Sequence, residues 1–336
     1  MPDERSWEIA EPRTLTFDGP VEELRIRIVD GAVNVVGTDA PRDAGEPGGP
    51  GNNGDAVPGG GSGRPAARVE VSALHGPPLR VLRRGRTLVV AYDDLTWKGL
   101  RSWRGRKRGR REAVVSVSVP AAVRLSVGVV GASAMVSGVR GPTQVRVVAG
   151  HCTLAGLSGD VTAETVSGNV EAQDLSGSLR VKSVSGELTL ADGGGSRVRA
   201  QSVSGAMILD LDPSAPRTDV ALRTVSGEIA VRLPPDAHAR VDARTVTGAV
   251  SSVFEELSAD GRWGAGRLTG TLGTGSGRLR AATVSGPIAL LRRPQPWSGD
   301  ALLPGDAPPG EAAPGDRDDG AGDVPRSRPE PLRKDG

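Results

Sequence analysis

One short motif recurs through the second half of the chain and constrains its fold more than any other feature. A triplet of Val or Leu, then Ser or Thr, then Gly begins at residues 136, 157, 166, 175, 184, 203, 225, 246, 268 and 284 of the 336-residue chain. The steps between triplets cluster near nine residues or near twenty, and self-similarity at a short fixed period is typical of repeat architectures. We therefore expect residues 121–293 to form a stack of repeated units of about twenty residues.

The residues on both sides of each triplet alternate between apolar and polar, as β-strands do. Val161, Ala163 and Thr165 precede one triplet and Val170 and Ala172 follow it, so the inward-facing parity changes across the triplet. Both arms can face one core only if the chain turns or slips by one residue there. Glycine suits such a corner because it adopts positive φ and lets a neighbouring backbone approach closely. The predicted structural corners are Gly138, Gly159, Gly168, Gly177, Gly186, Gly205, Gly227, Gly248, Gly270 and Gly286.

These patterns predict an all-β fold, a β-solenoid with rungs of about twenty residues and a β cap at its N-terminal end. The chain has only two Phe, five Trp and one Tyr, which fits a narrow core of small branched side chains. An antiparallel meander that uses the same units as hairpins is the alternative arrangement.

The N-terminal third shows strand patterns without the triplet. Alternating runs over 14–17, 24–28, 33–36, 68–72, 79–82, 87–92 and 114–119 predict strands, and Asp30-Gly31 between two of them predicts a hairpin. Pro-rich and Gly-rich composition predicts disorder at 41–66 and 294–336. The expected organisation is an arm at 1–12, a β cap at 13–120 with an insertion at 41–66, the solenoid at 121–293 and a tail at 294–336.

Charge and cysteine content limit the function classes and the cellular compartment that we expect for the chain. Its 42 Lys and Arg nearly balance its 40 Asp and Glu, so net charge alone does not indicate a nucleic-acid or membrane protein. A single cysteine, Cys152, excludes an intramolecular disulfide and a cysteine-based metal cluster. We find neither a secretory signal nor an apolar run of about 20 residues, so we expect no transmembrane segment and a cytoplasmic location.

A basic loop is the one sharp electrostatic feature. Between the predicted strands 87–92 and 114–119, eight of the fourteen residues at 98–111 are basic and two Trp are interleaved. Such a loop could neutralise phosphates of a nucleic acid or of lipid headgroups, with Trp stacking on a base or lying at a membrane interface. A solvated hairpin loop is the alternative. The candidate ligand-binding residues are Trp97, Lys98, Arg101, Trp103, Arg104, Arg106, Lys107, Arg108, Arg110 and Arg111.

No arrangement of residues predicts catalysis, a metal or a cofactor. His151 and Cys152 are neighbours on a predicted strand, so their side chains should point to opposite faces and not form a thiolate–imidazole pair. The enzymatic alternative is a β-helix acting on polysaccharide, which would need two facing carboxylates. The outward positions three residues after the triplets' first residue do not place acids on adjacent rungs. We therefore predict no catalytic residues and no enzyme.

At the segments Thr-Val-Ser-Gly-Asn-Val, Ser-Val-Ser-Gly-Glu-Leu and Thr-Val-Ser-Gly-Glu-Ile, with Val33-Asn34-Val35-Val36-Gly37-Thr38-Asp39, the chain resembles a bacterial β-strand-repeat family. This family is labelled "putative adhesin" and is also called the toastrack domain. The resemblance covers roughly residues 13–293. Its members are mostly uncharacterised, and several are fused or linked to membrane-stress signalling proteins, which implies an assembly or sensing scaffold. The family has no catalytic residues to carry over, and this chain differs from those members in its lack of an expected membrane segment.

The expected function is therefore a non-enzymatic scaffold or interaction protein built on β-strand repeats, in an envelope-stress or signalling assembly. Its rung faces or open edges would contact a protein partner. The alternative is binding of nucleic acid or an anionic membrane surface through the basic loop at 97–111.

Overall fold

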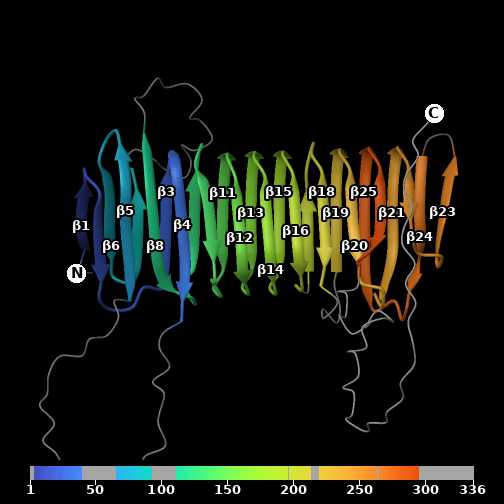
Figure 1. The fold of residues 1–336 in the computed structure, drawn as a ribbon, viewed down its shortest axis with the longest axis horizontal. Helices are drawn as coiled ribbons and strands as arrows, with labels where there is room; N and C mark the ends of the chain where they lie inside the picture. Colours follow the sequence, from blue (N-terminus) through green and yellow to red (C-terminus); the bar gives the residue numbers. More distant parts are fainter. Residues whose placement is uncertain are drawn as a thin grey trace, which may run out of the picture. The chain divides into compact units, whose positions relative to one another are not determined.

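The computed structural model describes residues 4–39, 66–92, 111–195, 197–212, 219–262 and 265–294. Within these residues the chain forms twenty-six strands in two sheets and no helix, so the predicted all-β fold is confirmed (Figure 1). In spatial order, sheet A contains β1 (Glu4–Ile9), β6 (Leu79–Arg84), β7 (Thr87–Ala91), β3 (Glu23–Ile28), β9 (Arg124–Val129), β11 (Thr143–Ala149), β13 (Val161–Ser167), β15 (Leu179–Ser185), β17 (Arg197–Gln201), β19 (Asp219–Ser226), β25 (Gly277–Ser285), β21 (Ala239–Thr247), β24 (Ala265–Leu272) and β23 (Leu257–Arg262).

Sheet B contains twelve strands. In spatial order they are β2 (Arg13–Phe17), β5 (Ala67–His75), β8 (Glu112–Pro120), β4 (Asp30–Thr38), β10 (Ser133–Ser137), β12 (Cys152–Leu157), β14 (Val170–Leu175), β16 (Leu188–Gly193), β18 (Met207–Leu211), β20 (Ile229–Leu233), β26 (Ile288–Arg292) and β22 (Val250–Ser252).

Each regular coil of the chain places one strand in sheet A and the next in sheet B. Neighbouring coils pair in parallel, with Thr143 opposite Val161 and Val161 opposite Leu179, a step of 18 residues. The step lengthens to 22 residues where Val198 faces Val220. The β-solenoid prediction is thus confirmed. The meander alternative is wrong for these coils, because their strands are parallel.

The core lies between the two sheets and is built from small branched side chains. In the middle of sheet A, Val145, Ala163, Val181, Ala200 and Leu222 face one another across successive coils and are all buried. Each coil thus covers the apolar residues of the next. Facing rows that mix Ala with Val or Leu leave little room for rings, which accounts for the scarcity of aromatic residues.

The parallel coils begin earlier in the chain than the repeat pattern indicates. The strands β3 and β4 lie in the segment predicted as a cap, yet β3 pairs in parallel with β9, and β4 with β10. The hairpin predicted at Asp30-Gly31 is therefore wrong, because the chain turns there from sheet A into sheet B. Gly31 is required at this turn, since its φ is 111° and a Cβ would lie 2.1 Å from the carbonyl oxygen of Ala113.

Antiparallel strands cover the N-terminal end of the solenoid. The strands β1 and β6 pair with each other, β6 forms a hairpin with β7, and β2 and β5 extend sheet B. The rings of Trp7 and Phe17 pack edge to face with centroids 5.2 Å apart, which joins β1 to β2. The strand β1 falls inside the segment expected to be an arm.

The coils at the C-terminal end do not follow the order of the sequence. The strand β25 pairs in parallel with both β19 and β21, and β26 pairs with both β20 and β22. The last coil of the chain is therefore inserted between the two coils that precede it in the sequence. The antiparallel hairpin β23–β24 then extends sheet A beyond β21.

The triplets occupy three structural positions. The glycines at the turns from sheet A to sheet B stack as a ladder, in which a Cβ on each would lie 2.0–2.3 Å from the carbonyl oxygen of the glycine in the neighbouring coil. This ladder consists of Gly168, Gly186, Gly205, Gly227, Gly286 and Gly248. A second ladder lies at the opposite turns, where Gly159 packs against Gly141 and Gly177 packs against Gly159.

Two of the predicted corner glycines lie outside these ladders, Gly138 at a turn from sheet B to sheet A and Gly270 within a strand. Gly138 follows β10, where the backbone of Gly37 approaches it, and its φ is 67°. Gly270 lies inside β24 and not at a corner, because the chain there forms an antiparallel hairpin instead of a coil. A Cβ at Gly270 would lie 2.5 Å from the carbonyl oxygen of Glu256.

Candidate functional site

The predicted basic loop lies outside the described residues except for Arg111 at its end. Its two flanks are described: Tyr92 follows β7 in sheet A, and Arg111 precedes β8 in sheet B. The Arg111 guanidinium lies 5.6 Å from the centroid of the Tyr92 ring. Burial raises the pKa of the Tyr92 hydroxyl, and burial with the nearby Glu112 raises the pKa of Asp30. The loop is therefore attached at a turn from sheet A to sheet B, at the same end of the sheet A strands as the first glycine ladder.

The outer face of sheet A carries a strong excess of positive charge. The five neighbouring strands β15, β17, β19, β25 and β21 contain nine basic and two acidic residues, at positions that alternate with the buried ones. The basic residues are Arg180, Lys182, Arg197, Arg199, Arg223, Arg278, Arg280, Arg240 and Arg244, and the acidic ones are Asp219 and Asp242. The paired strands of sheet B, β16, β18, β20, β26 and β22, carry two of each sign.

Little of this positive charge is neutralised within the sheet. Asp242 accepts two hydrogen bonds from Arg244, at 2.8 and 2.7 Å, and these bonds hold its pKa below the usual range. Among the described residues, the guanidinium groups of Arg180, Arg199 and Arg223 have no hydrogen-bond or ion-pair partner. Their guanidinium groups are therefore available to an external anion.

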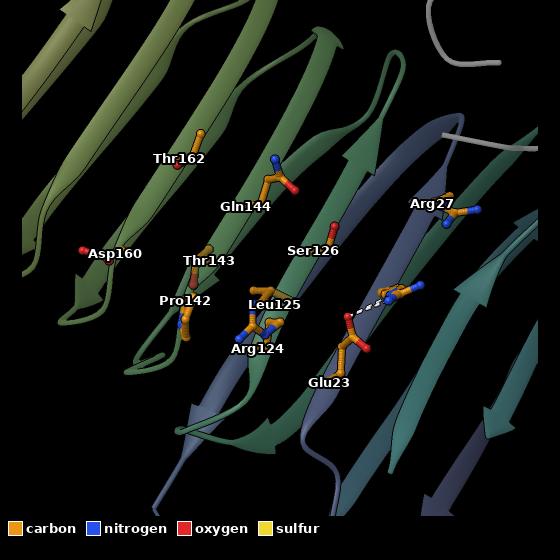
Figure 2. Close-up of a pocket in the computed structure, with 11 residues that line it drawn as sticks. Glu23, Arg27, Arg124, Leu125, Ser126, Pro142, Thr143, Gln144, Asp160 and Thr162 are labelled. Carbon is orange, nitrogen blue, oxygen red and sulfur yellow. Dashed lines mark hydrogen bonds and ion pairs between the residues drawn. The ribbon is translucent and has the colours of Figure 1, made fainter. Parts of the chain in front are cut away.

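A shallow hollow of about 470 Å³ opens on the same face near its N-terminal end (Figure 2). It crosses β3, β9, β11 and β13, with the short Ser126 between Arg25 on one side and Gln144 on the other. Arg25 is hydrogen-bonded to Glu23 at 2.9 Å, and burial followed by the charge of Arg25 lowers the pKa of Arg27. The hollow therefore has a mixed polar lining, in which three arginines stand beside the carboxylates Glu23 and Asp160.

A second hollow of about 820 Å³ lies near the C-terminal end of this face. Small side chains on β25 and β24, Ala282 and Ala265, lie in it beside the arginines Arg223, Arg244 and Arg267. It therefore combines small apolar side chains with a charged rim of three arginines and one acid, Asp260.

An exposed valine row runs along the end of the sheet A strands, next to these arginines. The first residue of the triplet at each turn from sheet A to sheet B is 40–58% exposed, whereas the Thr before it is buried wherever a Thr stands there. The register places these valines opposite one another across successive coils. In spatial order the valine row consists of Val166, Val184, Val203, Val225, Val284 and Val246.

Other candidate reactive groups are structural. His151 is exposed and Cys152 is buried, so their side chains point apart as expected, and burial raises the pKa of the Cys152 thiol to about 12. The Nδ1 of His238 accepts a hydrogen bond from the backbone N–H of Thr274 at 3.0 Å. Among the described ranges no group of three or more His, Cys, Asp and Glu side chains is arranged to hold a metal ion. The described part of the chain also has no helix long and apolar enough to cross a bilayer.

Two features of this face escaped the sequence analysis. The Arg excess is spread over five strands that are distant in sequence, and the inserted coil β25–β26 brings Arg278 and Arg280 between β19 and β21. The sequence pattern did not reveal that these valines are exposed, because the triplets at the opposite turns have a buried first residue, as at Leu157 and Leu175. The Thr or Ser before the valine was the available signal, since it takes the inward position.

Two solved structures and one family model are similar to this chain. A solved structure described as a "putative cell adhesion protein" from Clostridium sporogenes ATCC 15579 is similar at 9% identity and a TM-score of 0.25, covering 87% of this chain and 100% of that one. A "putative lipid binding protein" from Parabacteroides distasonis ATCC 8503 is similar at 11% identity and a TM-score of 0.38, covering 84% and 97%. No curated protein sequence matches the chain significantly. Residues 145–291 match the family described as Toastrack DUF4097, so the resemblance drawn from the repeats is confirmed for this segment.

Proposed function

We propose that the chain is a non-enzymatic interaction scaffold whose outer sheet A face binds a partner carrying negative charge. The observation that carries the proposal is the ratio of nine basic to two acidic residues on five neighbouring strands of sheet A, against two of each on the paired strands of sheet B. Parallel coils hold these side chains at a fixed spacing of about 4.8 Å between strands. A rigid array of basic side chains, in which the guanidinium groups of Arg180, Arg199 and Arg223 are unpaired among the described residues, favours association with anionic surfaces and accelerates their encounter.

A pull-down from native lysate tests this proposal. The full chain is compared with a face variant, Arg180→Ser/Arg199→Ser/Arg223→Ser, and with a control on sheet B, Arg232→Ser/Arg292→Ser. We expect the wild type and the sheet B control to recover the same partners and the face variant to lose them. Equal recovery by all three would contradict an interaction face on sheet A. The proposal that the chain is not an enzyme would be contradicted if the purified chain turned over a substrate and one of these substitutions abolished that turnover.

The cytoplasmic location and the protein nature of the partner belong to the same proposal. Fractionation of the native cells tests the first, and recovery of the same partners after nuclease treatment tests the second.

Binding of nucleic acid or an anionic surface through the basic loop at 97–111 is the second candidate. It is favoured by the eight basic residues and the two interleaved Trp, and by the attachment of the loop beside the first glycine ladder. It predicts that recovery collapses with nuclease, or when residues 93–110 are replaced by a short Gly-Ser turn.

A further inference from the structure

The outer face of sheet A carries an apolar row directly beside basic rows, and this combination identifies the class of its partner. On β15 and β19, Val184 and Val225 stand two residues after Lys182 and Arg223. Residues two apart on a strand point to the same face. The residues two positions before the six valines are, in spatial order, Glu164, Lys182, Gln201, Arg223, Ala282 and Arg244, so three of the valines lie next to a basic side chain.

The exposure of the valine row is built into the backbone. Thr224 precedes Val225 and is buried at 5% exposure, and strand alternation then directs Val225 outward at 51%. No change of rotamer can bury a side chain that points away from the core. Single exposed valines are common on proteins, whereas six in register form a contiguous apolar stripe, which marks an interaction surface.

Several classes of anionic partner would match the arginines, and the valine row selects among them. A nucleic acid or an acidic polysaccharide would occupy the cationic groups and leave the apolar stripe in water. The surface of a bilayer that contains anionic lipid presents negative headgroups and hydrocarbon within a few ångströms of each other. A bilayer also requires no matching cleft, which suits rows that repeat from coil to coil along parallel strands.

We propose that the outer face of sheet A docks onto a bilayer surface containing anionic lipid, with the valine row at the hydrocarbon boundary and the neighbouring arginines at the phosphates. The hollow lined by Ala282, Ala265 and Arg223 then accommodates part of one lipid headgroup and chain. Two acidic residues, Glu187 and Glu228, lie at the corners. They immediately precede β16 and β20 and are therefore on the sheet B side of the glycine ladder, outside the sheet A face that docks. This inference rests on the proposed function, because it assigns a bilayer, beside a protein, as a partner of the same anion-binding face.

Sedimentation of the full chain with vesicles tests the inference. Vesicles of phosphatidylcholine alone are compared with vesicles that also contain phosphatidylglycerol. The valine variant is Val184→Ser/Val203→Ser/Val225→Ser, and the matched control is Val36→Ser/Met135→Ser, because Val36 and Met135 are equally exposed on sheet B. We expect binding only to the anionic vesicles, weakened roughly tenfold by the valine variant and unchanged in the control. Each Arg→Ser change on sheet A should weaken binding about fivefold.

A second measurement reports the docked face directly. Because Cys152 is buried, an environment-sensitive dye can be directed to Val203→Cys or to the control Met135→Cys. We expect the emission of the dye to shift to the blue on anionic vesicles only when it is attached at position 203. Equal shifts at both positions, equal vesicle binding by all variants, or binding lost only when residues 93–110 are replaced would overturn the inference.

The outcomes separate this inference from the proposed function. If no vesicle binds while partner recovery in the pull-down still depends on Arg180, Arg199 and Arg223, the lipid inference is wrong and the interaction face stands. If neither depends on these residues, both are wrong.

Discussion

At the scale of single residues, the triplet and the Thr before it perform three separate tasks. In Thr-Val-Ser-Gly at 224–227, the Thr closes the core, the Val is directed outward, and the Gly lets the chain pass from sheet A to sheet B against the backbone of the next coil. The hydroxyl of Thr245, which occupies the same position as Thr224, donates a hydrogen bond to the carbonyl oxygen of Gly286 at 3.0 Å. Thr245 and Thr283 thus also satisfy backbone acceptors of the ladder, whereas the buried hydroxyls of Thr165 and Thr224 have no hydrogen-bond partner among the described residues.

The glycine ladder can be tested by substitutions that separate close contact from backbone strain. A Cβ at Gly168 would lie 2.1 Å from the carbonyl oxygen of Gly150, although the φ of Gly168 lies outside the left-handed region. Gly186 combines a φ of 124° with a contact of 2.3 Å. We expect Gly168→Ala to lower the free energy of unfolding by at least about 2 kcal/mol and Gly186→Ala by more, measured by urea denaturation.

Gly85 provides the matched control for this series. Its φ is 57°, and nothing lies within 4 Å of an added Cβ. Gly85→Ala should therefore cost only about 1 kcal/mol, the penalty of the left-handed conformation. A cost at Gly168 no larger than that at Gly85 would show that the coils move apart freely and that the ladder does not hold them in contact.

At the scale of elements, the sequence specifies each strand better than the order of the coils. Alternation predicted the strands at 68–72, 79–82 and 114–119, and β5, β6 and β8 contain them. The predicted strands at 79–82 and 87–92 are neighbours in the sequence, and β6 and β7 form a hairpin there. These features depend on residues close in sequence, whose side-chain pattern determines which face is buried.

The errors concern contacts between segments that are far apart in the chain. Nothing local in Ile288–Arg292 indicates that β26 lies between β20 and β22, because β26 and β20 present the same alternating apolar pattern to the core. The hairpin prediction at Asp30-Gly31 was wrong for a related reason. A Gly with positive φ serves a hairpin and a turn between sheets equally well, and only pairing with distant strands distinguishes them.

The inserted coil predicts an unusual response to truncation. A chain that ends after Gly275 lacks β25 and β26, so β21 and β22 lose the strands that connect them to β19 and β20. A chain that ends after Pro235 also lacks β21–β24 and keeps an uninterrupted stack. We expect limited proteolysis followed by mass spectrometry to show rapid digestion of residues 236–275 in the longer chain and a resistant body in both.

The opposite result would have a clear meaning. If residues 239–272 stay protected in the chain that ends after Gly275, β21 has paired directly with β19, and the coils are interchangeable. Direct pairing of β21 with β19 is the competing outcome because the two strands bury similar side chains. These are Val220 and Leu222 on β19, and Val241 and Ala243 on β21.

At the scale of the whole described body, the solenoid separates structure from recognition. The inner faces of the two sheets hold the coils together through contacts between neighbours, as in other repeat proteins. The outer faces are free to differ, and they do, because sheet A is basic with a valine row and sheet B has balanced charge over the paired strands. Substitutions on one outer face should therefore change binding with little effect on stability.

Replacement of residues 93–110 by a short Gly-Ser turn tests this separation for the basic loop. The flanks of the loop are fixed by the solenoid itself, since β7 pairs with β3 and β8 pairs with β4 over their whole lengths. We therefore expect the midpoint of thermal unfolding to change by less than about 3 °C. Partner recovery and vesicle binding through sheet A should stay within about twofold of the wild type at a fixed ionic strength, because the sheet A arginines remain. A much lower unfolding midpoint would show that the loop belongs to the cap. Loss of binding with an unchanged midpoint would instead assign recognition to the loop and make the solenoid its support.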